Sequence, residues 1–236
     1  MPDRPRQYVP QRNKLKEELK IRDIEWTPKQ KEFIDLILDK KSQIIFIEGP
    51  AGSSKTYLSV YCGLQLMNLK RISDIIYVRT VVESASRSLG FLPGEFEEKF
   101  KPFSAPLEDK LSEFLSENQI RMLKNDERIL AIPINYLRGA NFNAKFILAD
   151  ESQNFNIKEL ITLLTRLGKF SKMVICGDKM QSDLNGKSGF YKIFDVFNNE
   201  ESRQNGIYCL KFGKEDIVRN DILKFVLDKI EPILKQ

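Results

Sequence analysis

One stretch near the start of the chain has the residue types and spacing of a phosphate-binding loop. Gly49–Thr56 (GPAGSSKT) follows a short apolar run at 44–48 and precedes an apolar-periodic run at 57–69. A strand, a glycine-rich turn and a helix in this order are the context of the Walker A motif. Backbone N–H groups and the helix dipole then hold phosphate oxygens. We therefore expect these residues to bind a nucleotide: Gly49, Pro50, Ala51, Gly52, Ser53, Ser54, Lys55, Thr56 and Tyr57.

Two residues of the loop have assignable roles, and a third departs from the motif. Lys55 would contact the β- and γ-phosphates, and the Thr56 hydroxyl would bind Mg²⁺. The motif has glycine before the lysine, where this chain has Ser54. If φ is positive there, a non-glycine residue is less stable by roughly 1–2 kcal/mol. The alternative is a chance Gly-Pro turn ahead of a helix.

A second candidate site is a pair of adjacent carboxylates. Asp150 and Glu151 directly follow the apolar run Phe146–Ala149, so they are expected at the end of a buried strand and not on an ordinary surface. Asp150 would hold Mg²⁺ through water, because Mg²⁺ dehydrates reluctantly and takes few carboxylates. Glu151 would orient and deprotonate the attacking water.

A third strand end carries polar residues. Met173–Cys176 is followed by Gly177 and Asp178, and Gln181 lies in the next loop. The amide of Gln181 has a donor and an acceptor for the γ-phosphate or the water. The alternative is an ordinary loop glutamine.

Phosphoryl transfer also needs a cation near the γ-phosphate, in cis or from a neighbouring subunit. Arg138, Arg166 and Arg219 are the candidates for this arginine finger. Each of them could equally make a structural or nucleic-acid contact.

The elements that must position these residues alternate between strands and helices. We expect strands at 44–48, 75–78, 129–132, 134–137, 146–149, 173–176 and 207–212, and helices from Pro28, at 57–69, 157–167 and 217–230. Residues 13–23 could form a short basic helix, and Pro102 and Pro106 are expected to divide 83–125 into short helices. This order predicts an α/β fold with a mostly parallel sheet and helices on both faces, in which the three strand ends converge on one site.

Composition narrows the chemistry. The chain of 236 residues has no histidine, which excludes Ser-His-Asp, Cys-His and imidazole chemistry. Carboxylates, cations and backbone amides suffice for phosphoryl transfer. Residues 1–31 hold nine Lys/Arg against five Asp/Glu, and the rest holds 29 against 28, so the excess charge is N-terminal. We expect a basic arm at 1–25 and one domain at 26–236.

The sequence also suggests a compartment. The N-terminus lacks the apolar segment of a signal peptide, and no run approaches the roughly 18 apolar residues of a membrane helix. Cys62, Cys176 and Cys209 each lie in an apolar run, which favours buried, reduced thiols. We expect a cytoplasmic protein, in the host cytoplasm if it is phage-encoded.

Taken together, the motifs resemble the PhoH-like family. Beyond the loop at 49–56, they occur in family order at Leu89–Gly94, Tyr136–Gly139, Asp150–Asn154, Leu164–Gly168, Ser171–Asp178, Gln181–Leu184 and Asp216–Arg219. The resemblance implies a three-layer RecA-like P-loop fold related to superfamily 1 helicases, an RNA-related activity and ring-shaped oligomers. In that comparison Gln30 matches the glutamine that reads adenine, and Gln181 matches the γ-phosphate sensor. The compact form resembles phage-encoded members.

Three positions depart from the family pattern: Ser54 in the loop, Thr80 in place of proline, and Ser152 in place of alanine. We expect an ATPase that uses Mg²⁺ and acts on RNA or single-stranded DNA as a homo-oligomeric ring, with a hexamer favoured. Arg79 and Arg138 are candidate nucleic-acid contacts. Phe91, Phe100, Phe103 and Tyr136 could stack on bases or could equally be core residues.

Two alternatives remain. One is a nucleotide-binding regulatory module whose hydrolysis is weak because of Ser54. The other is a small-molecule kinase, which the Asp150-Glu151 pair and the segment Gly177–Gln181 disfavour.

Overall fold

A computed structural model of the chain describes residues 15, 17–80, 96–137, 139–181, 188–217, 222, 225–226 and 228–230. Within these ranges, only the backbone is described at 96–103 and at Met180. The motif at Leu89–Gly94, the candidates Arg138 and Arg219, the side chains of Phe91, Phe100 and Phe103, and most of the predicted helix at 217–230 lie outside what is described.

The described residues form a six-stranded sheet with strand order β3-β2-β4-β5-β1-β6. Every pair of neighbouring strands is parallel. The strands are β1 (Ile44–Glu48), β2 (Asp74–Arg79), β3 (Ile129–Pro133), β4 (Lys145–Ala149), β5 (Lys172–Gly177) and β6 (Ile207–Lys211).

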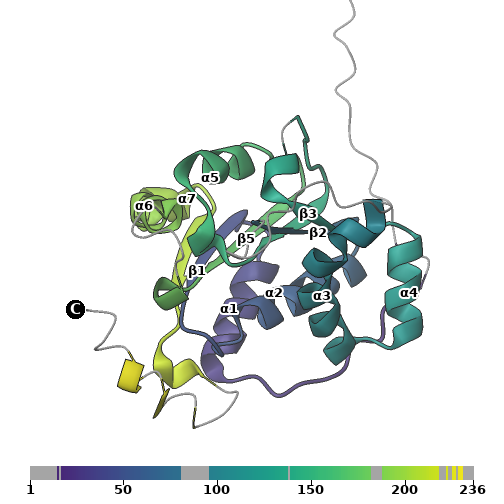
Figure 1. Cartoon of the computed structure of the whole chain (residues 1–236), viewed down its shortest axis with the longest axis horizontal. Coiled ribbons are helices and arrows are strands. Elements are labelled where there is room, and N and C mark those ends of the chain that lie inside the picture. Colours follow the sequence, from purple (N-terminus) through teal and green to yellow (C-terminus); the bar gives the residue numbers. More distant parts are fainter. Residues whose placement is uncertain are drawn as a thin grey trace, which may run out of the picture.

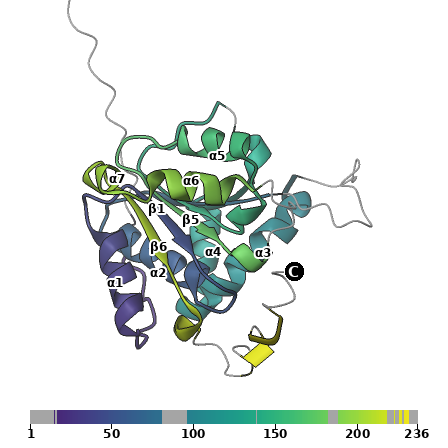
Figure 2. The ribbon, with the colours of Figure 1, turned by 90° about the vertical axis from the view of Figure 1, so that its left-hand side faces the viewer.

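Helices cover both faces of this sheet (Figures 1 and 2). The α-helices are α1 (Pro28–Leu38), α2 (Lys55–Asn68), α3 (Phe96–Phe114), α4 (Glu117–Asn125), α5 (Ile157–Leu164), α6 (Gly189–Phe197) and α7 (Glu200–Gln204). Single 3-10 turns are η1 (Ile134–Tyr136), η2 (Ser152–Asn154), η3 (Lys179–Gln181) and η4 (Lys214–Asp216).

Alternation along the strands divides the core into two layers, because successive side chains point to opposite faces. On one face, Ile45 and Ile47 of β1 pack with residues of α1, α2, α3 and α4. On the other face, Phe46 of β1 packs with residues of α5 and α6. The predicted three-layer α/β fold is therefore confirmed, and its sheet is parallel throughout the described residues.

Helix α1 shows how local sequence sets an element. Thr27 caps it through its side chain, Gln30 completes a capping box, and Pro28 occupies the first turn. Phe33 and Ile37 are buried against the sheet. The predicted start of this helix is confirmed.

Two predicted elements are wrong where prolines occur. Residues 134–137 are not a strand: β3 ends at Pro133, and the chain turns into η1. Residues 96–114 are one helix despite Pro102 and Pro106. Leu107, Leu111 and Phe114 of this helix are almost fully buried. Burial of these three side chains, worth roughly 1.5–3 kcal/mol each, is similar in size to the roughly 3 kcal/mol that each of the two internal prolines costs, and so it offsets that loss.

The N-terminal segment also differs from its prediction. Residues 17–27 contain no helix. The Asn68 side chain holds the backbone of Leu19 in both directions: its oxygen accepts from the Leu19 N–H at 2.8 Å, and its amide donates to the Leu19 carbonyl at 2.9 Å. Leu19 is buried, so the described part of this segment packs on the domain.

Two further sequence predictions can be compared with the structure. Cys62 and Cys176 are buried, free thiols, whereas Cys209 is only partly buried. Burial raises the pKa of Cys209 to about 12. Among the described residues, no helix is both long and apolar enough to cross a membrane.

Candidate nucleotide-binding site

The three polar strand ends lie side by side. The strand order places β4, β5 and β1 next to one another, and each ends at the same edge of the sheet. A cavity of about 590 Å³ opens there. The strand-end residues and the loop before α2 line this cavity: Ala51, Gly52, Ser54, Lys55, Thr56, Tyr57, Arg79, Asp150, Glu151, Gln153, Cys176, Gly177, Asp178 and Gln181.

The loop between β1 and α2 contains two left-handed backbone positions. Gly52 has φ 82° and Ser54 has φ 63°. The positive φ anticipated at Ser54 is therefore present, and its side chain makes no cap hydrogen bond to α2. The buried Ser53 hydroxyl donates to the Pro50 carbonyl at 2.8 Å and closes the turn. At Gly49 an added Cβ would lie 2.8 Å from Phe212 Cβ, so only glycine fits.

The Lys55 ammonium is held over the loop that it follows. Its Nζ donates to the carbonyl oxygens of Gly49 at 2.7 Å and Pro50 at 2.9 Å. Lys55 also opens α2, where the N–H groups of a first helical turn attract anions. A cation and a helix N-terminus therefore face the same cavity.

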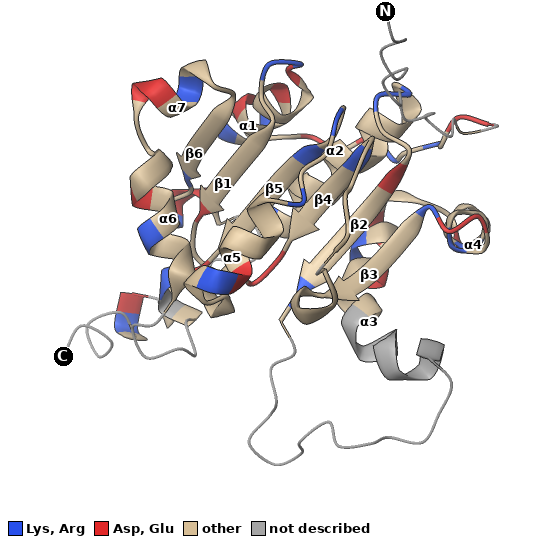
Figure 3. Ribbon diagram, turned by 90° about the horizontal axis from the view of Figure 1, so that it is seen from above, with Lys and Arg blue, Asp and Glu red and all other residues tan. Residues whose placement is uncertain are grey.

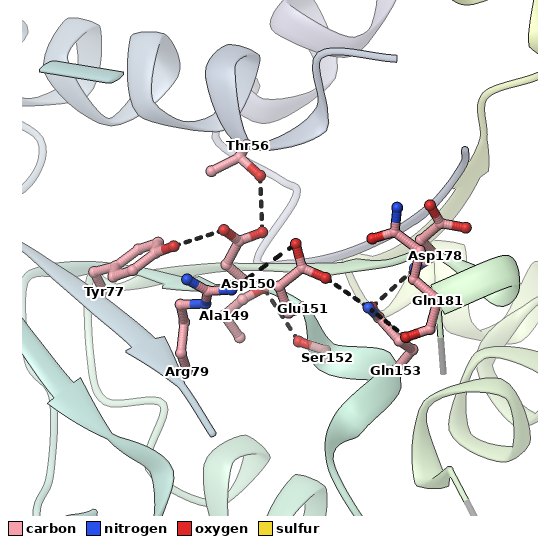
Figure 4. Close-up of polar contacts among 10 residues, drawn as sticks. All are labelled: Thr56, Tyr77, Arg79, Ala149, Asp150, Glu151, Ser152, Gln153, Asp178 and Gln181. Carbon is pink, nitrogen blue, oxygen red and sulfur yellow. Dashed lines mark hydrogen bonds and ion pairs between the residues drawn. The ribbon is translucent and has the colours of Figure 1, made fainter. Parts of the chain in front are cut away.

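Asp150 is bound on both of its oxygens (Figure 4). The Thr56 hydroxyl donates to Oδ1 at 2.8 Å, and the Tyr77 hydroxyl donates to Oδ2 at 2.6 Å. Burial, and next the charge of Asp150, raise the pKa of Tyr77 far above its ordinary value. Tyr77 thus stays a donor over the working pH range, and it fixes the rotation of the Asp150 carboxylate.

Glu151 lies at the centre of a second network (Figure 4). Its Oε2 accepts from Gln153 Nε2 at 2.6 Å, and its Oε1 lies 4.0 Å from Arg79 Nη2. Gln153 Oε1 accepts from the Asp178 backbone N–H at 3.0 Å, and its Nε2 reaches the Gln181 carbonyl at 3.4 Å. Glu151 itself has φ 52° and ψ 37°. The strand ends of β4 and β5 are thereby joined through one buried amide.

The remaining predicted residues are distributed differently. Gln30 lies outside the described lining of the cavity, and its side-chain oxygen accepts from the Thr27 N–H at 2.9 Å. Arg166 donates to the carbonyls of Thr162 at 3.2 Å and Ala140 at 3.1 Å, which favours a structural role within its own chain. Arg79, predicted as a nucleic-acid contact, lines the nucleotide cavity.

Tyr57 borders the cavity from the first turn of α2. Its ring stacks on Phe114 at 4.3 Å, and Lys110 Nζ lies 5.8 Å from its centroid. Lys110, Glu113 and Pro106 of α3 line the same cavity. These α3 residues, with Tyr77 and Gln153, were not predicted as site residues. Gln153 had a signal, since it follows the carboxylate pair by two positions, whereas Tyr77 resembles an ordinary core position.

A parallel sheet with a glycine-rich loop before a helix, a threonine in the first turn of that helix bonded to an aspartate after β4, and a glutamate next to that aspartate defines a P-loop nucleotide-binding fold. Residues 24–231 match the family described as PhoH-like protein, and the chain belongs to this family. Membership implies a nucleotide-binding P-loop domain.

Relatives come from several bacteria. A PhoH-like protein of Mycobacterium leprae is 35% identical over 204 residues, covering 86% of this chain and 56% of the relative. A PhoH-like protein of Bacillus subtilis is 33% identical over 201 residues, covering 84% and 61%. Protein PhoH of Escherichia coli K12 is 33% identical over 192 residues, covering 80% and 53%. This chain therefore spans little more than half the length of these relatives.

Proposed function

We propose that this protein hydrolyses ATP with Mg²⁺ and couples hydrolysis to the binding or remodelling of RNA or single-stranded DNA. The observation that carries the proposal is the shared cavity in which Asp150 is bound to Thr56 while Glu151 faces Arg79. These groups have the chemistry that phosphoryl transfer requires, and none of them is a histidine.

The donor set fits Mg²⁺. Thr56 Oγ1 and Asp150 Oδ1 lie 2.8 Å apart, both are oxygens, and Mg²⁺ takes one or two such protein ligands together with water and phosphates. These two residues would hold the ion, which when bound neutralises charge on the β- and γ-phosphates. The other donor on Asp150, Tyr77, would keep the carboxylate turned toward Thr56.

The protein's own groups would then act on water and phosphate. The Glu151 carboxylate accepts a proton from the attacking water, and Gln153 holds that carboxylate in place. Lys55 compensates charge on the β- and γ-phosphates. Arg79 is the one arginine among the described residues that line the cavity, so it is the candidate for a cation in cis. Gln30 and Gln181 are proposed to contact the adenine and the γ-phosphate.

A ring is proposed as the active assembly, with a hexamer favoured. Its support is the family membership and the need of a single core for a cation from a neighbour. Arg166 and Arg219 are the candidates for that cation, and Arg138 is a candidate nucleic-acid contact. Sedimentation of the protein with and without Mg²⁺-ATP tests the ring. Monomers at every concentration would contradict it.

The test of the activity is phosphate release with and without single-stranded RNA and DNA. We expect turnover that requires Mg²⁺ and rises on adding a single strand. Glu151→Gln should lower turnover by roughly 10²–10⁴-fold while ATP binding persists, because only the base is removed. Turnover that is unchanged in this variant would overturn the proposed role of Glu151.

A second candidate is a regulatory module that binds ATP but turns it over slowly. The observation that favours it is the left-handed backbone at Ser54, which strains the phosphate-binding loop. The two candidates differ in one measurement. A wild-type rate that is negligible while ATP binds tightly supports the module, and an ordinary rate excludes it.

A further inference from the structure

A second cavity lies at the other end of the strands, opposite the nucleotide cavity. Its volume is about 620 Å³, and its walls are the loop before β1, the end of α2 with the turn after it, and the turn before β5. Since β1 begins at Ile44 and β5 at Lys172, the cavity faces the amino ends of these strands. The nucleotide site lies at their carboxyl ends. We name this second site the amino-edge cavity.

The charge of the amino-edge cavity is strongly positive. Four cations line it, Lys40, Arg71, Lys169 and Lys172, against one carboxylate, Asp39. By contrast, the nucleotide cavity is lined by three cations and four carboxylates. In Figure 3, Lys and Arg positions gather at the end of the sheet where β4 and β5 begin. The amino-edge cavity therefore attracts an anion without needing a metal ion.

The floor of the cavity holds a fixed charge. Lys172 is buried, and its Nζ donates to the carbonyls of Ile37 and Asp39 and to the Ser42 hydroxyl. Arg71 donates to the Leu38 carbonyl beside it. All three N–H groups of the Lys172 ammonium already donate to protein oxygens. Lys172 therefore contributes positive charge to the cavity but no direct hydrogen bond to a ligand. Direct contacts are left to the exposed lysines, Lys40 and Lys169, and to the half-buried Arg71.

An aromatic ring stands at the rim. Phe170 is 51% exposed and has φ 61°, an unusual backbone for a bulky residue. Its turn is anchored on both sides: the Lys169 carbonyl accepts from the Ala144 N–H at 2.8 Å, and the Ser171 hydroxyl donates to the Phe142 carbonyl at 2.5 Å. The ring is thus presented to solvent from a rigid turn, next to Lys169.

We propose that the amino-edge cavity binds a segment of single-stranded nucleic acid, with phosphates at Lys40, Arg71 and Lys169 and a base stacked on Phe170. Cations that follow a backbone, combined with an aromatic stacking platform, are the parts from which single-strand sites are built. The inference rests on the proposed function, because it locates the strand that the ATPase acts on. It places that strand at the far end of the sheet from ATP.

The experiment measures binding of fluorescent oligo(U) RNA and oligo(dT) DNA to the full chain by anisotropy over a range of salt. Phe170→Ala should weaken binding by roughly five-fold or more, because one base loses its stacking partner. Phe170→Trp should restore binding. Lys169→Glu should weaken binding and lower the slope of log affinity against log salt by about one.

Matched controls separate this site from general electrostatics. Lys158→Glu makes the same charge change on an exposed position of α5, and Phe225→Ala removes the aromatic ring of a residue that is 61% exposed near the C-terminal end of the described residues. Both should bind as the wild type does. If Lys158→Glu weakens binding as much as Lys169→Glu, or if Phe170→Ala binds normally, the amino-edge site is wrong. Thermal melting and turnover without nucleic acid should be unchanged in all variants.

Two outcomes distinguish this inference from the proposed function. If the wild type binds neither oligonucleotide at low salt, the nucleic-acid part of the proposed function fails, and this inference fails with it. If the wild type binds and is stimulated but the Lys169 and Phe170 variants behave normally, only this inference fails. A change in sedimentation of Lys169→Glu with unchanged oligonucleotide binding would assign the cavity to a protein contact and overturn the proposal.

Discussion

Ser54 holds the phosphate-binding loop in a conformation that glycine adopts more easily. Its φ is 63° and ψ is 18°, immediately before Lys55 begins α2. A side chain there destabilises the folded loop by roughly 1–2 kcal/mol relative to glycine. The loop nevertheless closes through Ser53, which is buried and bonded to Pro50. Within the loop at 49–56, the strain is therefore confined to Ser54, the residue next to Lys55.

We expect Ser54→Gly to raise the free energy of unfolding by up to about 1 kcal/mol, because glycine relieves the strain but gains entropy in the unfolded chain. Turnover should rise or stay constant. Lys70→Gly is the control, since Lys70 also has a positive φ, 56°, but lies at the far end of α2. Denaturation measures the free energy of unfolding of both variants, and phosphate release measures their turnover. A less stable Ser54→Gly protein would contradict the strain argument.

Gln153 is a positioning residue, because it contacts Glu151 and the β5 end but no reacting atom. Gln153 is 1% exposed, its Nε2 donates to Glu151, and its Oε1 accepts from the Asp178 N–H. We expect Gln153→Ala to lower kcat by roughly ten-fold with little change in KM, as removal of an orienting partner does elsewhere.

Ser152→Ala is the matched control for Gln153. Ser152 lies in the same turn, and its hydroxyl donates to the Ala149 carbonyl at 3.2 Å and not to the Glu151 carboxylate. This variant should keep the wild-type kcat and KM. An equal loss of rate in both variants would mean that the turn as a whole, and not the Gln153 amide, supports Glu151.

At the scale of elements, the end of β5 packs so closely against α6 that no side chain fits at Gly177. An added Cβ at Gly177 would lie 2.6 Å from the Phe190 ring of α6. The Gly177 carbonyl accepts from the Gly49 N–H at 3.1 Å, so β5 and the phosphate-binding loop share this junction. Helix α6 therefore sets the position of the loop through one glycine.

Gly177→Ala should lower the free energy of unfolding by roughly 1–3 kcal/mol through overpacking, and it should weaken ATP binding. Adding Phe190→Leu should restore part of both losses. Gly63→Ala is the control, since its Cβ would lie 2.9 Å from the Phe146 ring under α2 and away from the strand ends. It should affect stability alone. Urea unfolding and nucleotide titration provide the measurements.

Local patterns predict the elements whose signals are local. Apolar runs followed by polar strand ends locate β1, β4 and β5, and a capping residue with proline locates α1. The two prolines mislead in opposite directions. A strand is predicted to resume after Pro133, where β3 in fact ends. A helix is predicted to break at Pro106, where α3 in fact continues because its apolar side chains are buried. The Tyr77–Asp150 bond follows from pairing of β2 with β4, in which Tyr77 lies opposite Leu148. The spacing of residues along the sequence does not reveal this register between β2 and β4.

At the scale of the whole molecule, the two ends of the parallel strands carry different kinds of residues. Carboxylates and the phosphate-binding loop occupy the carboxyl edge, whereas cations gather at the amino edge. Lys172 ties the amino edge together, because it joins the start of β5 to the end of α1. Burial lowers the pKa of Lys172 to about 8. A charge is thus held inside the fold at neutral pH, and this makes stability depend on pH.

The sign of this dependence follows from the two states. Below about pH 8 Lys172 is protonated whether folded or unfolded, and its contribution is constant. Between about pH 8 and the unfolded value near 10.5, the unfolded chain binds a proton that the folded chain does not, so stability rises with pH. The buried thiols of Cys62 and Cys176 act in the opposite direction, since burial raises their pKa values.

Comparison with Lys172→Met removes the lysine while both proteins keep these cysteines, and because the Lys172 charge lowers the pKa of Cys62, the difference between the two proteins includes that coupling. The variant removes a buried charge but leaves the carbonyls of Ile37 and Asp39 without their donor. We expect the stability of the wild type relative to the variant to increase between about pH 7 and about pH 9.5, by no more than roughly 3 kcal/mol. Urea unfolding of both proteins at the two pH values measures it. A difference that stays constant would show that Lys172 keeps its ordinary pKa in the fold.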